Sequence, residues 1–379
     1  MSIETLWLRD RFAKKSPQAI EVNATLPVAQ MPTPMTTQVP DISVIIPTQN
    51  RADSLRITLE CLASGNRGGL QVEIVVVNNA GHDNTEEIVC SFAQRIPIRY
   101  LYEPTLGTFG KSHALNCALD AGSLGGLIAI LDDDMSPDAN WFQGVAAISA
   151  RWPEKDLFTG YTHIVWPCDQ VPAWATAPKL QSWLFSAGHV PETDAEMKTG
   201  RWFLGGHFWF RSRVLENGRR FKDIWVTEPD FQLDLVQSGY SGVSGRDAKA
   251  GHRVQPALLQ KEVVTQRARK TGKCAAWLRV QPYREHMKQA RMLHQYPVAG
   301  RIFCLANHLR WLALYLISYL FPAGGTGFAR RLIALERMAN YLELFRAANQ
   351  LDAYSLSRRI RDTVVRAQTN RVAQTSLSS

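Results

Sequence analysis

Residues 127–134 read LIAILDDD, a short apolar run that ends in three consecutive aspartates. Continuous apolar runs of this length are typical of strands that are buried on both faces of a parallel sheet. Three adjacent carboxylates are costly to fold unless a cation neutralises them. The stretch therefore predicts a buried strand that carries acidic side chains to its carboxyl end, where open α/β sheets bind their ligands.

The residues before this stretch repeat the same alternation. Three other apolar runs precede it, at 42–46, 72–77 and 98–102. Segments with helical spacing of apolar residues separate the runs, at 53–64, 83–94 and 111–121. This alternation predicts an α/β fold with a Rossmann-like, mostly parallel sheet flanked by helices. The polar residues after each strand are therefore the candidate site residues.

Length and composition suit a folded chain with more than one part. The 379 residues are 45% apolar and include 11 tryptophans, which excludes a disordered protein. The six cysteines form no CxxC pair, which argues against a zinc site or a disulfide framework. We predict an N-terminal segment and flexible linker over 1–40, an α/β domain over 41–285 and a basic, mainly helical region over 286–379.

The net charge of +9 is distributed unevenly along the chain. Residues 261–379 contain 20 basic and 6 acidic residues, whereas residues 1–260 contain 23 basic and 28 acidic ones. A slightly acidic body is thus followed by a strongly basic last third. Such asymmetry predicts an anionic partner for the tail, either a membrane surface or a nucleic acid.

The three aspartates are candidate metal ligands. On an extended segment the side chains of Asp132 and Asp134 point the same way and that of Asp133 the opposite way. Two such carboxylates could share one Mg²⁺ or Mn²⁺ ion, which would also bind phosphate oxygens of a substrate. The alternative is a solvated acidic turn, or a cap for the helix that contains Trp141.

Several motifs resemble those of family 2 glycosyltransferases of the GT-A fold. PTQNR and VVVNNAGHDNTEEI resemble the family's PTYNR opening and its VVVDNGSTDGT segment, and GTFGKSHALNCAL resembles GKSAALNAGL. ILDDDMSPDANWF is similar to the segment centred on the DxD motif. Later matches lie at 203–221, at 226–240 and at 251–279. The resemblance covers roughly residues 41–280, and its order and spacing make it more specific than any single motif.

The resemblance implies a GT-A domain over 41–285 and inverting transfer from a UDP-, GDP- or dTDP-sugar to a hydroxyl acceptor. It implies Mn²⁺ or Mg²⁺ at Asp132 and Asp134, with His252 near the metal or the diphosphate; for a lone histidine, a structural role is the alternative. Such an ion would neutralise charge on the leaving diphosphate. The candidate donor-binding residues are Pro47, Thr48, Asn50, Arg51, Asn78, Lys111, Asp132 and Asp133.

Inversion needs a base that takes the proton of the acceptor hydroxyl. By resemblance to the family's ED motif, Asp230 is the first candidate and Glu228 the second, with Pro229 between them. Asp230 could instead cap the helix that begins there. Lys111 could reach the diphosphate or be a surface lysine at a helix start.

One residue departs from the family pattern. The family usually has aspartate where this chain has Asn78, and that aspartate accepts a hydrogen bond from the donor's base. The amide oxygen of Asn78 can still accept such a bond, but its NH₂ group also donates. The departure leaves the identity of the donor base open.

The acceptor side and the tail complete the expectations. Gly206, His207 and Trp202 are candidate acceptor contacts, in an aromatic region that could instead be ordinary core. Residues 302–321 are long enough to span a membrane, but Asn307, His308 and Arg310 favour a helix at the membrane interface, and a core helix is a further alternative. Because the N-terminus lacks an apolar signal-peptide region, we expect a cytoplasmic protein. The basic tail leads us to expect that it is peripheral on the inner face of the membrane. We further expect a polysaccharide or lipid-linked acceptor.

Two other classes remain as alternatives. A metal-dependent nucleotidyltransferase also needs carboxylates beside a parallel sheet, but no glycine-rich triphosphate loop follows the first strand. A basic nucleic-acid-binding protein would fit the charged tail, but the tail shows no recognisable binding motif. We therefore expect no nucleic-acid partner.

Overall fold

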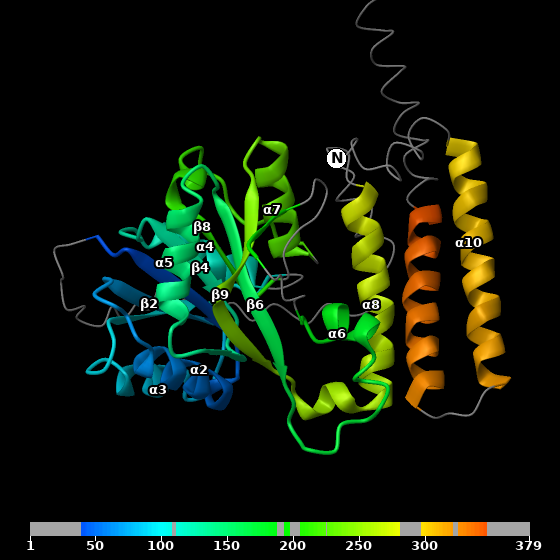
Figure 1. Ribbon diagram of the computed structural model, residues 1–379, viewed down its shortest axis with the longest axis horizontal. Helices are drawn as coiled ribbons and strands as arrows, with labels where there is room; N and C mark the ends of the chain where they lie inside the picture. The colour runs from blue at the N-terminus through cyan, green and yellow to red at the C-terminus, as the bar shows by residue number, and fades with distance from the viewer. Residues whose placement is uncertain are drawn as a thin grey trace, which may run out of the picture. The chain divides into compact units, whose positions relative to one another are not determined.

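The computed structural model describes residues 39–107, 111–187, 193–197, 205–224, 226–280, 297–320 and 325–346 (Figure 1). All described residues belong to one compact unit.

A mixed sheet forms the centre of the described fold. Its first half is parallel, with strand order β3-β2-β1-β4. These strands are β1 (Ile42–Thr48), β2 (Val72–Asn79), β3 (Ile98–Glu103) and β4 (Leu127–Leu131). The four predicted apolar runs are thus confirmed as strands, and each ends at the same edge because the strands run in parallel.

The second half of the sheet is largely antiparallel. β8 (His207–Arg211) pairs antiparallel with β4 and joins it to β6 (Leu157–Val165). β9 (Gly242–Arg253) lies parallel to β6 and antiparallel to the short β5 (Met135–Pro137), and β7 (Ala195–Glu196) pairs with β9. β5 directly follows the three aspartates, so this pairing brings β9 to them.

Helices cover both faces of the sheet because successive strand residues point to opposite sides. Val44 and Val76 pack toward α2 (Ala52–Ser64), α3 (Thr85–Ser91) and α5 (Trp141–Arg151). Ile45 and Val77 pack toward α4 (Ser112–Asp120) and α7 (Thr227–Gln237). Two apolar cores result, one on each face, and this confirms the predicted mostly parallel α/β sheet with flanking helices.

The C-terminal part is helical, as predicted. The predicted region 286–379 contains α10 (Pro297–Ile317) and a helix over residues 325–346, whereas α8 (Lys261–Val280) precedes it, inside the predicted 41–285 domain. Short elements complete the fold; these are α6 (Pro178–Leu184) and the 3₁₀ turns η1 (Ser212–Leu215), η2 (Pro256–Leu259) and η3 (Ser318–Leu320). α6, α8 and the 325–346 helix share an apolar core around Trp174, Leu180 and Leu332.

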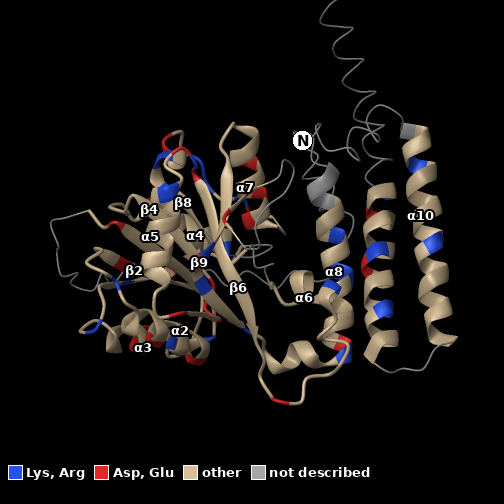
Figure 2. Cartoon of the chain, in the orientation of Figure 1, with Lys and Arg blue, Asp and Glu red and all other residues tan. Residues whose placement is uncertain are grey.

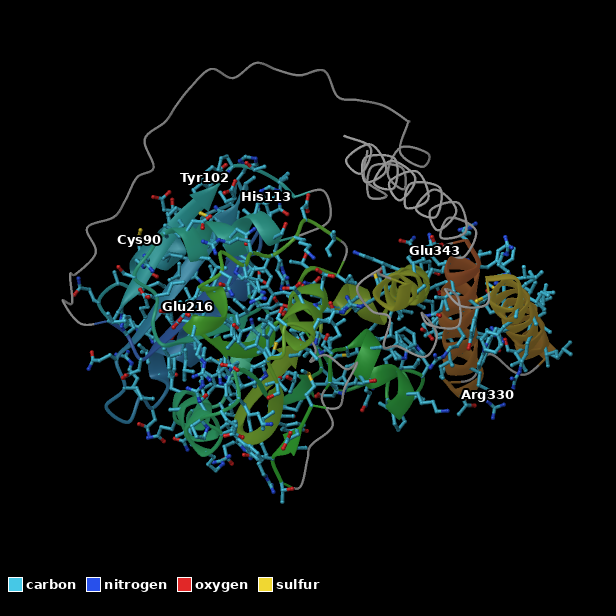
Figure 3. All side chains as sticks on the ribbon, turned by 90° about the horizontal axis from the view of Figure 1, so that it is seen from above. Cys90, Tyr102, His113, Glu216, Arg330 and Glu343 are labelled. Atoms are coloured by element: carbon cyan, nitrogen blue, oxygen red, sulfur yellow. The ribbon has the colours of Figure 1, made fainter. Side chains whose placement is uncertain are left out.

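The 325–346 helix packs against both long helices. Gly272 of α8 lies directly against the backbone of Glu336, and Cys304 of α10 packs with Ala276 and Leu344. Figure 3 shows the three helices from above. Within the described ranges, no helix is both long enough and apolar enough to cross a membrane. The predicted domain boundary at 285/286 falls outside the described residues.

Candidate functional site

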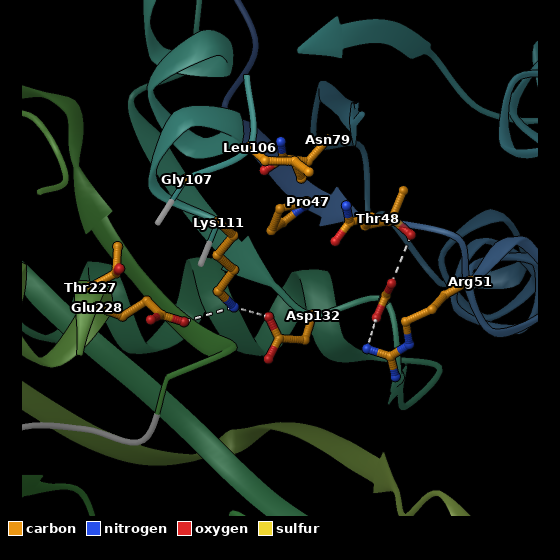
Figure 4. Close-up of a pocket in the computed structure, with 12 residues that line it drawn as sticks. Pro47, Thr48, Arg51, Asn79, Leu106, Gly107, Lys111, Asp132, Thr227 and Glu228 are labelled. Atoms are coloured by element: carbon orange, nitrogen blue, oxygen red, sulfur yellow. Dashed lines mark hydrogen bonds and ion pairs between the residues drawn. The ribbon is translucent and has the colours of Figure 1, made fainter. Parts of the chain in front are cut away.

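A pocket of about 510 Å³ opens at the carboxyl edge of the parallel strands (Figure 4). Its walls come from the ends of β1, β2 and β4, from the start of α7 and from residues before α4. The lining residues are Pro47, Thr48, Gln49, Arg51, Asn79, Leu106, Gly107, Lys111, Asp132, Asp133, Thr227 and Glu228. Five predicted donor-binding residues besides Asp132 lie here: Pro47, Thr48, Arg51, Lys111 and Asp133.

Backbone hydrogen bonds fix the aspartates between two strands. The Asp132 amide donates to the Gly206 carbonyl at 2.9 Å, next to β8. The Arg253 amide donates to the Asp134 carbonyl at 2.9 Å, at the end of β9. In the β5–β9 ladder Met135 lies opposite His252, which places the His252 ring beside Asp134. The sheet thus holds the aspartates in place without using their carboxylates.

Asp133 points inward and anchors the loop. Its carboxylate accepts a 2.7 Å hydrogen bond from the Thr48 hydroxyl and forms a 2.7 Å ion pair with Arg51. Burial raises the pKa of Asp133 to about 6, although Arg51 and Thr48 act to lower it. This carboxylate is 3% exposed and is already committed to protein partners.

Asp134 has one satisfied and one unsatisfied carboxylate oxygen. Its Oδ2 forms a 2.7 Å ion pair with Arg51 and lies 3.6 Å from Nε2 of His252. Its Oδ1 is buried and has no hydrogen-bond partner. Burial alone would raise the pKa of Asp134, but His252 and Arg51 hold it well below its usual range. A buried, ionised oxygen without a partner is rare in native structures and points to a missing ligand.

The donor set around Asp134 fits a divalent cation. Nδ1 of His252 lies 2.6 Å from the Phe185 carbonyl, an arrangement in which Nδ1–H donates and Nε2 faces Asp134. Metal-binding histidines typically hold their second ring nitrogen in this way. No group of three His, Cys, Asp or Glu side chains within the described ranges forms a complete metal site. Mg²⁺ and Mn²⁺ sites that use few protein carboxylates are usually completed by substrate phosphate and water.

Asp132 faces a different partner from Asp134. Its carboxylate pairs with Lys111, and the same Lys111 ammonium lies 2.7 Å from Oε1 of Glu228 (Figure 4). Burial alone would lower the pKa of Lys111, but the two carboxylates raise it well above its ordinary value. The two carboxylates thus have different cationic partners within the protein: Asp132 pairs with Lys111 and Asp134 with Arg51.

The two candidate bases occupy different places. Glu228 lines the pocket from the first turn of α7. Asp230, on the same turn, is 1% exposed, lies 3.3 Å from Nζ of Lys222 and does not line the pocket. The geometry brings the second-ranked candidate, Glu228, to the other site residues and leaves the first-ranked Asp230 in the interior.

The predicted asparagines do not reach the pocket wall. Asn50 adopts a left-handed backbone (φ 51°) and its Oδ1 accepts a 2.7 Å bond from the His82 amide. Asn78 is 2% exposed, and its amide group bonds to Gly81 and to the Tyr100 hydroxyl. The next residue, Asn79, lines the pocket instead, because successive residues of β2 point to opposite faces.

Of the predicted acceptor contacts, Gly206 lies at the aspartates and His207 in the core. Gly206 has φ +85°, and a Cβ atom there would overlap the Asp132 carboxylate. His207 is 2% exposed: its Nε2 accepts a 2.9 Å bond from the Trp141 indole, and its Nδ1 lies 2.9 Å from the Thr162 hydroxyl. Neither ring nitrogen is free for an acceptor. Trp202 lies outside the described residues.

Some site residues escaped the sequence reasoning. Asn79, Leu106 and Thr227 line the pocket, and Arg253 donates to the carbonyls of Asp133 and Met135 and so holds the aspartate loop. Asn79 could have been chosen from the sequence, because it closely follows the apolar run 72–77 and so lies at a strand end. No sequence pattern identified Arg253, because it lies more than 100 residues from the aspartate loop to which it donates.

Part of the chain is similar in sequence to known glycosyltransferases. Residues 43–164 match the family model "Glycosyl transferase family 2". Chondroitin synthase of Escherichia coli is 34% identical over 109 residues, which are 29% of this chain and 16% of that protein. Glycosyltransferase AglE of Haloferax volcanii is 32% identical over 135 residues, 35% of this chain and 43% of that protein. The matched part of the chain thus spans less than half the length of either relative.

A solved structure shows the same fold. A mannosyltransferase from Pyrobaculum calidifontis, in complex with GDP-mannose and Mn²⁺, superposes with a TM-score of 0.50 at 18% identity. The alignment covers 84% of this chain and 90% of that one. At this identity the likeness concerns the fold, and it agrees with the predicted GT-A architecture.

Proposed function

We propose that the chain transfers a sugar from a nucleoside-diphosphate sugar to a hydroxyl acceptor, since residues 43–164 match the family model "Glycosyl transferase family 2". The observation that carries the proposal is the partnerless, buried Oδ1 of Asp134, a carboxylate whose other oxygen faces His252 and which directly follows the pocket residues Asp132 and Asp133. A divalent cation bound together with an anionic donor would give this oxygen the partner that it lacks. The relative solved with GDP-mannose and Mn²⁺ supports the same ligand class.

In this proposal Asp134 and His252 would hold the cation, with Asp132 nearby. When bound, Mn²⁺ or Mg²⁺ would neutralise negative charge on the diphosphate leaving group. Lys111 supplies a second positive charge, since its ammonium lies at the pocket wall between Asp132 and Glu228. Arg51 orients the Asp133 and Asp134 carboxylates through two 2.7 Å ion pairs.

Glu228 acts as the general base in this proposal. The acceptor oxygen attacks the anomeric carbon, the bond from that carbon to the diphosphate breaks, and the hydroxyl proton passes to the Glu228 carboxylate. A single displacement of this kind inverts the configuration of the sugar. Glu228 is favoured over Asp230 because it lines the pocket, whereas Asp230 is 1% exposed. Geometry decides the choice of a base before its pKa does.

Recognition of the donor base falls to Asn79 rather than Asn78. Asn79 lines the pocket and its Nδ2 donates to the Thr105 carbonyl at 2.9 Å, which directs its Oδ1 away from that bond. A carbonyl oxygen in this position can accept from the ring N–H that uracil, thymine and guanine all carry. The predicted cytoplasmic location at the inner face of a membrane, with a lipid-linked or polysaccharide acceptor, remains part of the proposal.

A thermal-shift panel tests the proposed ligands. UDP-, GDP- and dTDP-sugars are added with and without Mn²⁺ to the full chain. We expect one donor to raise the melting temperature only when Mn²⁺ is present, since the diphosphate completes the cation site. If no donor raises it under either condition, the proposed function is wrong.

A matched pair of variants tests the base. Glu228→Gln should lower turnover by about a hundredfold to ten-thousandfold and retain donor binding, because only the proton acceptor is lost. Asp230→Asn changes a carboxylate on the same helical turn and should retain turnover, provided that its melting temperature shows a folded protein. Full turnover by Glu228→Gln would reject Glu228 as the base.

A further inference from the structure

Helix α10 and the turn after it carry a row of exposed apolar side chains. Its members are three, four or seven residues apart, spacings that keep them on one helix face. Its members are between 41% and 82% exposed; they are Val298, Ile302, Leu305, Leu309, Leu316 and Leu320. A helix on the surface of a water-soluble domain normally presents polar residues on its outer side.

The opposite face of α10 is the one that packs on the protein. Cys304 is 1% exposed within a cluster with Ala276 and Leu344. One turn further, Nδ1 of His308 lies 2.9 Å from the Met338 carbonyl of the 325–346 helix. The apolar row therefore points away from the part of the chain to which α10 is anchored, and no described residue covers it.

The charges around the row are of one sign. Residues 297–320 include Arg301 and Arg310 but no acidic residue, and Figure 2 shows α10 with basic residues only. Arg310 and Arg330 are exposed. Arg331 stacks over the ring of Tyr319 at 4.2 Å, and that ring is itself 56% exposed. A surface with leucines, exposed tyrosine and arginine is typical of helices that lie in the interface of an anionic membrane.

We propose that α10 binds the surface of an anionic lipid bilayer and lies in the plane of the membrane. Its 21 residues extend about 31 Å at 1.5 Å per residue, so the row offers a long, flat contact. Leu305 and Leu309 enter the boundary between headgroups and acyl chains, and Arg310 and Arg330 lie at the level of the lipid phosphates. A second copy of the chain fits less well, because this face supplies no carboxylate to meet the arginines.

Flotation of the full-length chain with vesicles tests the proposal without any sugar donor. We expect the chain to float with phosphatidylcholine vesicles that contain phosphatidylglycerol and to float far less with phosphatidylcholine alone. Leu305→Glu/Leu309→Glu should weaken partitioning by at least about tenfold, since two apolar side chains no longer enter the lipid. Arg310→Gln/Arg330→Gln should weaken it by about fivefold for each charge and only with the anionic vesicles.

A matched control adds two acidic residues elsewhere. Ile57→Glu/Gln94→Glu places the same charge on exposed positions of the α/β domain and should leave flotation unchanged. Unfolding temperatures of all variants show whether each is folded. Equal flotation of wild type and Leu305→Glu/Leu309→Glu overturns the proposal. So does a wild-type dimer, by light scattering, that this variant converts to a monomer while neither protein binds vesicles. A failure of the glycosyltransferase proposal would leave the flotation result unaffected.

Discussion

At the carboxyl edge of the sheet the three aspartates and Glu228 lie beside cationic partners, whereas on α10 Arg310 has no carboxylate on its own helix. Arg51 bridges Asp133 and Asp134, and Lys111 bridges Asp132 and Glu228. On α10, Arg310 is exposed beside leucines. The edge resembles a site organised for a small ligand, because burial forces its charges into fixed pairs. The helix resembles a surface for a broad anionic partner.

The largest effect is expected when the charge of Asp134 is removed. Asp134→Asn should lower turnover by at least about a thousandfold and abolish any Mn²⁺-dependent rise in melting temperature, because the partnerless oxygen is the proposed cation ligand. Steady-state turnover with the donor found in the panel measures the effect. Asp53→Asn, an exposed aspartate in the first turn of α2, is the control and should change neither quantity. Near-normal turnover of Asp134→Asn would mean that the edge does not bind the cation there.

The next test asks whether the Asp132 carboxylate can move from its position beside Gly206 without loss of turnover. Gly206→Ala should lower turnover by about tenfold to a hundredfold and destabilise the fold by about 1–3 kcal/mol, since its Cβ would overlap the Asp132 carboxylate at φ +85°. Gly218→Ala is the matched control: it has φ +69° but open space around the added Cβ. It carries the backbone strain alone, about 1 kcal/mol, and should keep full turnover. Equal turnover of the two variants would show that Asp132 can move freely.

The parallel half of this edge could be predicted from the sequence because its strands are continuous apolar runs. Burial on both faces imposes that pattern, and parallel strands place their polar ends together. The choice between Glu228 and Asp230 could not be predicted. Residues two apart on a helix lie about 200° apart around its axis, so only one of them can face the pocket. Which one does so depends on how α7 packs against the sheet.

The roles of the two predicted histidines, His207 and His252, could not be predicted from the sequence either. His207 begins β8 and His252 lies near the end of β9, and both were predicted to contact ligands. Their environments come from distant segments: Trp141 and Thr162 surround His207, and Phe185 and Asp134 surround His252. A sequence motif records neither set of neighbours, because they meet only through tertiary packing.

The tail can be tested separately from the edge at the crossing of α8 with the 325–346 helix. Gly272→Ala should destabilise the fold by about 1–2 kcal/mol, although alanine favours helices, because its Cβ would meet the Glu336 carbonyl. Thermal unfolding measures the change. Thr271→Ala, the neighbouring position on α8, gains helix propensity without this overlap and should be neutral or slightly stabilising. A higher melting temperature for Gly272→Ala would contradict the close helix packing that anchors the tail.

The last test concerns how pH changes stability through His207, whose burial no carboxylate offsets. Burial lowers its pKa to about 3 from an ordinary value of 6.5. As the pH falls below 6.5, the unfolded chain takes up a proton before the native protein does, so stability is lost toward pH 3 by about 1.4 kcal/mol per pH unit. Asp133, whose pKa is raised to about 6, acts in the opposite direction as the pH falls from 6 toward 4.

Only a difference between variants therefore isolates the histidine. The free energy of unfolding of His207→Gln, measured by denaturant titration across this pH range, should fall less steeply than that of wild type. His82→Gln, at an exposed position, should follow the wild-type curve. Parallel curves for wild type and His207→Gln would mean that His207 gains a proton in the native state. A buried imidazolium without a carboxylate partner would then exist beside the site, and burial would not force the charges of this part of the protein into pairs.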